Sequence, residues 1–218
     1  KKYSKINWSL KSMKGLKICG VSDPKTLDYI LNHKHQPTMI GFITNYEKSK
    51  RFIKYEKLRQ LINVDKKKVK FVSVLVNPDN KILEKIKDLN FDYYQLYDVS
   101  PQRTEEIKLK YKIKIITAIT VSNKEDVIKY KDYLNISDII LYDSKGYHKS
   151  ESFDHSLLDK VPDKLNKMIA GNIQIDDIPN LKDKNYIVDL SGALEDRNGK
   201  KDINKIDKLL NLFKKIWN

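Results

Sequence analysis

A chain of 218 residues, 40% of them hydrophobic, is long enough for one sizeable α/β domain, and its single cysteine excludes an internal disulfide framework. No apolar run approaches the roughly 20 residues that a membrane-spanning helix needs, and no signal peptide is apparent at the start. We therefore expect a soluble, cytoplasmic protein that does not interact with membranes.

The formal net charge of +14 raises the question of nucleic-acid binding. Only four basic residues are arginine, and the lysines are spread along the whole chain and mixed with acidic residues. Nucleic-acid-binding proteins usually cluster their positive charge on one face and favour arginine for base and phosphate contacts. We therefore expect a solvated surface and no nucleic-acid partner, although the charge would help attract an anionic substrate.

After a polar, basic extension over residues 1–15, short apolar runs alternate with helical patterns. We expect strands at 16–21, 38–43, 69–76, 91–97, 114–121, 138–143, 167–171 and 186–191. We expect helices at 24–33, 54–62, 80–89, after Ser100-Pro101, after Ser122, and at 154–159, 176–181 and 202–217. Ser22 and Ser122 are expected to be helix caps.

Eight strand–helix units favour a parallel sheet covered by helices, and the absence of a leftover strand favours closure into a (β/α)8 barrel. Periodicity does not distinguish closure, so an open doubly wound sheet is the alternative. No linker rich in Pro, Gly or Ser divides the chain. We expect one barrel domain over residues 16–218 behind the extension.

In such a barrel the carboxyl ends of all strands face one mouth, where active sites are built. The first strand ends at Cys19, which by itself could equally be a buried, inert thiol. Small-residue turns follow the seventh and eighth strands and would let backbone N–H groups approach a phosphate. The residues at or just after the strand ends are Cys19, Arg51, Asn77, Gln95, Thr120, Asp143, Gly171, Asn172, Ser191, Gly192 and Ala193.

Several short motifs stand at these strand ends, beginning with Lys17-Ile18-Cys19-Gly20-Val21. Further motifs follow at 41–43, 48–51, 74–77, 94–96, 141–144, 153–154, 169–171, 189–191, 195 and 199–202. In this order and spacing they resemble the phosphoribosylanthranilate isomerase family of tryptophan biosynthesis. The resemblance extends from Leu16 essentially to the C-terminus.

The resemblance implies a barrel that catalyses an Amadori rearrangement of N-(5-phosphoribosyl)anthranilate with one acid and one base, without cofactor or metal. Asp143 would be the general acid for the ring oxygen, and Cys19 the general base for the C2′ proton. Arg51 would bind the anthranilate carboxylate, and Asp189 the sugar hydroxyls. The implied substrate-binding set is Arg51, Gln95, Asp189, Gly171, Asn172, Ser191, Gly192 and Ala193, with backbone N–H groups of the small-residue turns on the phosphate.

These roles require shifted pKa values. A thiol of ordinary pKa, about 8.5, would need a modest downward shift to act as a base at neutral pH. A carboxyl group would need its pKa raised from about 3.9 to hold a proton. The sequence shows the need for these shifts and not their presence.

The chain also departs from the family pattern. The usual glycine-rich loop after the sixth strand keeps only Gly146, the usual Gly-Gly after the seventh is Gly171-Asn172, and the usual histidine after Gln-Leu is Tyr97. These changes leave two alternatives open: a catalytically impaired barrel that binds a phosphosugar or a protein partner, and an isomerase for a related phosphosugar. We expect a monomer or a weak homodimer.

Overall fold

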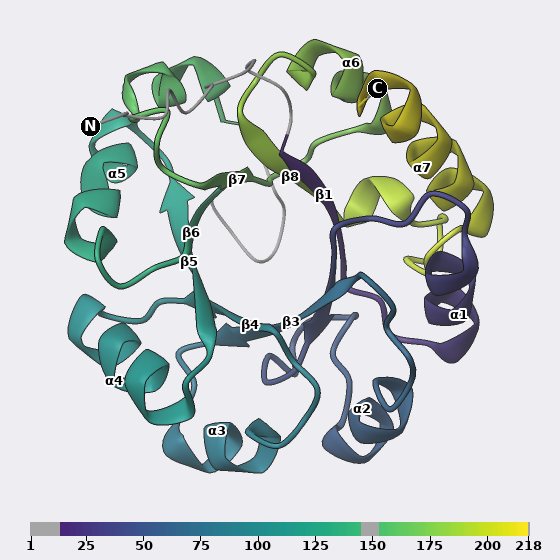
Figure 1. The fold of residues 1–218 in the computed structure, drawn as a ribbon, viewed down its shortest axis with the longest axis horizontal. Coiled ribbons are helices and arrows are strands. Elements are labelled where there is room, and N and C mark those ends of the chain that lie inside the picture. Colours follow the sequence, from purple (N-terminus) through teal and green to yellow (C-terminus); the bar gives the residue numbers. More distant parts are fainter. Residues whose placement is uncertain (1–13, 145–152, 218) are drawn as a thin grey trace, which may run out of the picture.

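The computed structural model describes residues 14–144 and 153–217, and its eight parallel strands form a closed barrel in sequence order (Figure 1). Closure through pairing of the first and last strands excludes the open sheet that was the alternative. The strands are β1 Gly15–Cys19, β2 Met39–Ile43, β3 Lys70–Val76, β4 Tyr93–Tyr97, β5 Lys114–Val121, β6 Ile139–Ser144, β7 Lys167–Ile169 and β8 Tyr186–Leu190.

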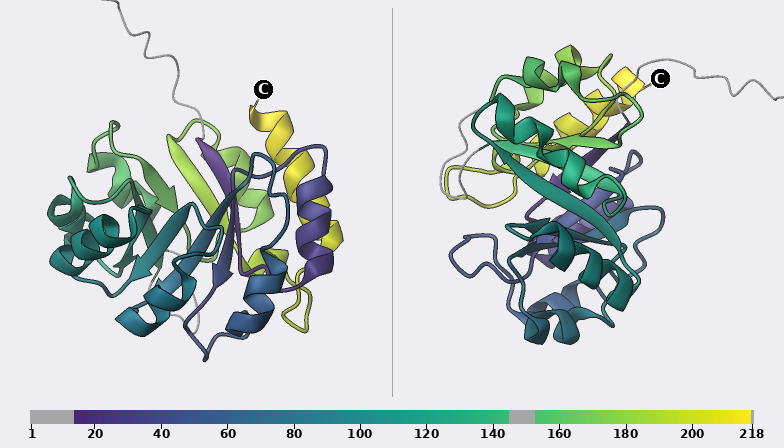
Figure 2. Two further views of the ribbon diagram at one scale, coloured as in Figure 1. Left: turned by 60° about the horizontal axis from the view of Figure 1, so that its bottom comes forward. Right: turned by 90° about the vertical axis from the view of Figure 1, so that its left-hand side faces the viewer.

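Helices form a ring around the strands, and the last helix lies beside the first (Figures 1 and 2). The α-helices are α1 Pro24–Asn32, α2 Tyr55–Leu61, α3 Asn80–Ile86, α4 Pro101–Tyr111, α5 Lys124–Val127, α6 Ile178–Leu181 and α7 Ile203–Trp217. The short 3-10 helices are η1 Ile128–Tyr133, η2 His155–Lys160, η3 Ile175–Asp177 and η4 Gly192–Leu194. None of these helices is long and apolar enough to cross a membrane.

Two of the expected helix caps were wrong by one residue. Asp23, not Ser22, caps α1, because its carboxylate accepts a 2.8 Å hydrogen bond from the Thr26 N–H. Asn123, not Ser122, caps α5 in a reciprocal capping box with Asp126. In both cases a neighbouring side chain with an equally good acceptor reaches the free N–H groups of the first turn.

Side chains alternate along each strand between two apolar cores, one under the helices and one inside the barrel. On β1, Leu16 and Ile18 pack outward under the helices, whereas Lys17 and Cys19 point into the barrel. The inner core consists mainly of aliphatic side chains, including Val72, Ile116 and Met168. Polar side chains interrupt this inner core near the carboxyl ends of the strands, where the mouth of the barrel begins.

The register between β1 and β8 determines which polar side chains meet in the interior. Lys17 pairs with Asp189 across these strands, although the two residues lie 172 positions apart. On the other side of the barrel Thr120 of β5 pairs with Asp143 of β6. Cys19, Asp189 and Asp143 therefore converge on the same mouth.

Candidate active site

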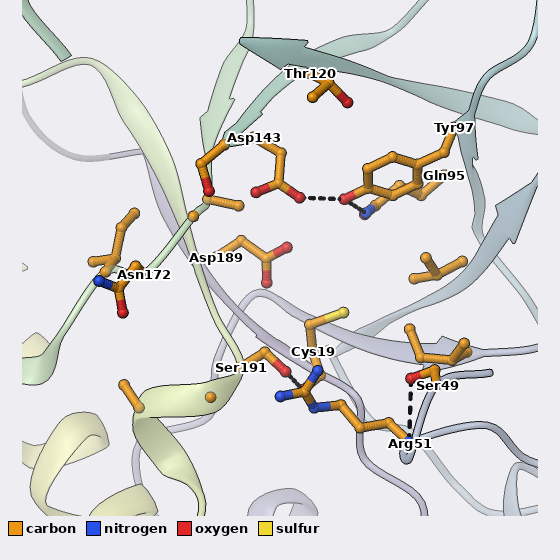
Figure 3. Close-up of a pocket in the computed structure, with 18 of the residues that line it drawn as sticks. Cys19, Ser49, Arg51, Gln95, Tyr97, Thr120, Asp143, Asn172, Asp189 and Ser191 are labelled. Atoms are coloured by element: carbon orange, nitrogen blue, oxygen red, sulfur yellow. Dashed lines mark hydrogen bonds between the residues drawn. The ribbon is translucent and has the colours of Figure 1, made fainter. Parts of the chain in front are cut away.

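A cavity of about 450 Å³ opens at the carboxyl ends of the strands. Ligand pockets for small molecules are commonly of this size. Every site residue expected from the sequence lines it: Cys19, Arg51, Gln95, Asp143, Gly171, Asn172, Asp189, Ser191, Gly192 and Ala193. Thr120 also lines it (Figure 3). Asn77 does not, and it borders a separate hollow beside α2 and α3.

Cys19 lies next to a fully buried ion pair. Lys17 Nζ is 2.6 Å from Asp189 Oδ2, and the Lys17 side chain has no solvent exposure. Burial by itself lowers the pKa of Lys17, but the adjacent Asp189 and Cys19 raise that pKa overall, so the amine is charged. A methyl group on Gly41 would lie 2.8 Å from Cys19 Sγ and 3.1 Å from Lys17 Nζ. Glycine on β2 therefore provides the space for the thiol and the ammonium.

The pKa of the Cys19 thiol is shifted in the direction opposite to the requirement stated from the sequence. Burial raises it above its ordinary value, and the attraction of the Lys17 ammonium for the thiolate offsets only part of this effect. Desolvation penalises the charged form of any buried acid. Cys19 is therefore protonated in the free protein at neutral pH.

Asp143 shows the shift that a general acid requires. Burial raises the pKa of its carboxyl group to about 6, and the nearby Asp189 adds to this effect. The Tyr97 hydroxyl donates a 2.7 Å hydrogen bond to Asp143 Oδ2, which opposes the rise. Gln95 Nε2 in turn donates to the Tyr97 oxygen at 3.3 Å (Figure 3).

Arg51 reaches the cavity from the loop after β2 and is held there by Glu195. Arg51 Nε and Nη2 both bond to the Glu195 carboxylate, the second at 3.1 Å. Lys50 and Lys201 also contact this carboxylate, at 2.8 and 3.0 Å. Burial would raise the pKa of Glu195, but its three cationic partners lower it to about 2. The remaining guanidinium N–H groups of Arg51 have no acceptor within residues 14–144 and 153–217 and suit an anion.

The turns after β7 and β8 present backbone N–H groups to the cavity. Gly171 and Asn172 both adopt positive φ, 95° and 53°, which glycine and asparagine tolerate best. In η4, the N–H groups of Gly192 and Ala193 donate to no acceptor among residues 14–144 and 153–217. Free backbone N–H groups of this kind suit an anion, and phosphate binding by these turns stays a prediction.

Three buried polar atoms that belong to cavity residues have no hydrogen-bond partner within the described ranges: Gln95 Oε1, Ser144 Oγ and Asp189 Oδ1. A buried polar atom without a partner costs free energy, which a hydrogen bond from a bound ligand or a water removes. Two of these atoms are pure acceptors, which suit hydroxyl groups.

Residues of this arrangement that were not assigned roles from the sequence include Lys17, Tyr97, Glu195 and Lys201. Lys17, Glu195 and Lys201 stand inside motifs that carry the family resemblance, which was the available signal. Gly146 and the rest of the expected loop change at 145–152 lie outside the described residues. Within those residues, no group of three or more His, Cys, Asp or Glu side chains could hold a metal ion.

Comparison with known proteins gives a consistent result. The family model described as N-(5'phosphoribosyl)anthranilate (PRA) isomerase matches residues 16–212. The N-(5'-phosphoribosyl)anthranilate isomerase of Rhizobium rhizogenes is 33% identical over 203 residues, which cover 88% of this chain and 90% of the relative. The enzyme of the same name from Agrobacterium fabrum is 31% identical, with 88% and 91% covered.

Solved structures agree with this result. Phosphoribosyl anthranilate isomerase from Thermotoga maritima superimposes with a TM-score of 0.79 and 26% identity, covering 92% of this chain and 98% of its own. A phosphoribosyl anthranilate isomerase in complex with reduced 1-(o-carboxyphenylamino)-1-deoxyribulose 5-phosphate gives a TM-score of 0.76 at 25% identity, with the same coverage.

Proposed function

Since the chain belongs to the N-(5'-phosphoribosyl)anthranilate isomerase family, we propose that its barrel mouth catalyses the Amadori rearrangement of N-(5-phosphoribosyl)anthranilate. The product is 1-(2-carboxyphenylamino)-1-deoxyribulose 5-phosphate. The observation that carries the proposal is one cavity in which Cys19, Asp143 and Arg51 meet beside the turns after β7 and β8.

Asp143 acts as the general acid. It gives its proton to the furanose ring oxygen while the ring C–O bond breaks and the anthranilate nitrogen forms a double bond to C1′. The raised pKa of Asp143, about 6, supports this role because a carboxyl group of ordinary pKa would hold almost no proton at neutral pH.

Cys19 acts as the general base and removes the C2′ proton, and the resulting enol then converts to the ketone. Because burial raises the pKa of the thiol above its ordinary value while that of Asp143 is about 6, most of the free enzyme at neutral pH has a protonated Cys19 and an ionised Asp143. The productive form, a thiolate with protonated Asp143, is a minor one. The Lys17 ammonium is the cation that stabilises its thiolate.

The binding roles follow the polar groups of the cavity. Arg51 binds the anthranilate carboxylate through the guanidinium N–H groups that Glu195 leaves open. Asp189 Oδ1 and Gln95 Oε1 accept from sugar hydroxyls, since both lack a partner among the described residues. The N–H groups of Gly171, Asn172, Gly192 and Ala193 bind the phosphate, and Ser191 orients this turn by donating to the Cys19 carbonyl at 3.0 Å.

We also propose that residues 16–218 act as one domain behind the extension 1–15. The protein would work as a cytoplasmic monomer or weak homodimer without a nucleic-acid partner. Several lysines support the last point because they pair with neighbouring acids, as Lys66 does with Asp92 and Lys108 with Asp138. Charge neutralised in this way does not form a continuous basic surface.

The test is a fluorescence assay in which the substrate is generated in situ from anthranilate and phosphoribosyl pyrophosphate. Asp143→Asn and Cys19→Ala should each lower kcat at least about 100-fold, because each removes one partner of the proton transfer. The exposed Asp88→Asn is the matched control and should turn over like wild type. Near-normal turnover in either site variant would contradict its role. No turnover from folded wild type would favour the binding barrel instead.

A further inference from the structure

Three inward-facing side chains from two strands form a hydrogen-bonded row that ends at Asp143. Gln95 and Tyr97 are two residues apart on β4 and so point to the same side of the sheet. Gln95 Nε2 donates to the Tyr97 oxygen at 3.3 Å, and the Tyr97 hydroxyl donates to Asp143 Oδ2 at 2.7 Å. Figure 3 shows the ring of Tyr97 directed at the carboxyl group of Asp143.

We propose that Tyr97 is a positioning residue that holds the Asp143 carboxyl group and keeps its transferable proton on Oδ1. The inference rests on the proposed role of Asp143 as general acid. The direction of the two hydrogen bonds supports this inference. Because the Gln95 amide donates to the Tyr97 oxygen, the phenol proton is turned toward Asp143. An oxygen that accepts from Tyr97 does not also carry the acid proton, so that proton resides on the other oxygen.

The tyrosine is suited to be a permanent donor. It is 8% exposed, and burial together with the nearby Asp143 raises the pKa of its hydroxyl far above the ordinary value. The phenol therefore stays protonated wherever the enzyme is folded and active. A histidine, which is usual at this position in the family the sequence resembles, would change its own charge near neutral pH.

The proposal predicts the direction of a change in acidity. The titratable and charged groups that face Asp143 are Tyr97 from β4, Asp189 from β8 and Lys17 from β1, with Cys19 beside Lys17. The Tyr97 hydrogen bond favours the carboxylate, so its loss raises the pKa of Asp143. Because the pKa of Cys19 lies above that of Asp143, the acidic limb of kcat/KM against pH reports Asp143.

The experiment compares wild type, Tyr97→Phe and Tyr94→Phe. Tyr94 is the matched control because it lies on the same strand but packs outward against Phe91 and Tyr111. In Tyr97→Phe, the acidic limb should move to higher pH by about one unit while KM changes little. The Asp143 carboxyl titration, followed without substrate by infrared difference spectra against Asp143→Asn, should move equally. Tyr94→Phe should leave both unchanged.

An Asp143 titration that is the same in Tyr97→Phe and wild type would overturn the proposal. Gln95→Leu gives an independent measurement if Tyr97→Phe folds poorly. It frees the Tyr97 hydroxyl to rotate, so the pKa of Asp143 should rise by a smaller amount. An unchanged pKa of Asp143 in this variant would argue against the proposal. Failure of the proposed function is distinguishable, because Asp143→Asn would then retain turnover whatever the infrared titration shows.

Discussion

Asp143 combines a functional requirement with a cost in stability. Its carboxyl group is buried, and the pKa near 6 shows that ionising it inside the barrel is harder than in the unfolded chain. The folded-state pKa is raised above the unfolded value of about 3.9, so the barrel loses stability as pH rises from about 4 to 6 and does not regain it above. The packing of the rest of the barrel therefore offsets the free-energy cost of keeping this carboxyl group buried.

Asp143→Asn should therefore stabilise the protein while it removes turnover. The gain in free energy of unfolding at pH 7.5 should be on the order of 1–3 kcal/mol, because the neutral amide avoids the ionisation cost and still accepts from Tyr97. Urea unfolding at pH 7.5 and pH 4 measures it, and the gain should disappear at the lower pH. Asp189→Asn is the contrasting variant: it leaves Lys17 buried without its anion and should destabilise. A destabilised Asp143→Asn would contradict this account.

At the scale of elements, the turns after β7 and β8 both border the proposed phosphate site but differ in how strongly they require glycine. A methyl group at Gly171 would lie 2.8 Å from the backbone N of Ser144, and φ there is +95°. At Gly192 the nearest atom to such a methyl group is Arg51 Nη2 at 3.7 Å, which is ordinary contact. The first turn is therefore restricted by the adjacent end of β6, whereas the second has space.

Gly171→Ala should lower the free energy of unfolding by about 2 kcal/mol, since it combines a backbone clash with an unfavourable φ. Gly192→Ala should stay within about 0.5 kcal/mol of wild type. Urea unfolding of the two variants side by side makes the comparison. Equal stabilities would show that the end of β6 moves to accommodate the methyl group.

At the scale of the whole molecule, Glu195 and its partners Lys50, Arg51 and Lys201 form a cluster that joins the loop after β2 to the segment after β8. Arg51 follows β2 and Glu195 follows β8, 144 positions later, so the bond between them connects the segments after the two strands that pair with β1. Lys201 is buried in the same cluster. The carboxylate therefore balances several cations whose positions depend on barrel closure.

The pKa of Glu195, lowered to about 2, determines the pH range in which this cluster stabilises the fold. A depressed folded-state pKa contributes stability above the unfolded value of about 4.3 and loses it as pH falls toward 2. Glu195→Gln should cost about 3 kcal/mol at pH 7, because the buried Lys201 loses its anion, and should flatten the stability profile between pH 4.5 and 3. Urea midpoints at pH 7, 4.5 and 3 test it. An unchanged slope in the variant would assign acid sensitivity to other carboxylates.

The sequence by itself determined the eight strand–helix units and the residues at the carboxyl ends of the strands, whereas closure into a barrel was settled by the pairing of β1 with β8. Alternating apolar runs and helical patterns predict eight strand–helix units, and parallel strands bring their carboxyl ends to one side. Cys19, Asp143 and Arg51 could therefore be placed near one another before any contact was known. Where prediction failed at this level, as for the caps Asp23 and Asn123, two adjacent residues had nearly equal capping ability.

Only the tertiary structure decided how these groups act on one another. The Lys17–Asp189 pair depends on the register of strands at opposite ends of the chain, and the bond from Tyr97 to Asp143 joins residues 46 positions apart. The upward shift of the Cys19 pKa, contrary to the requirement stated from the sequence, comes from desolvation inside the barrel. Register, burial and hydrogen-bond direction are properties of packed neighbours distant in sequence, and a one-dimensional pattern does not encode their distances.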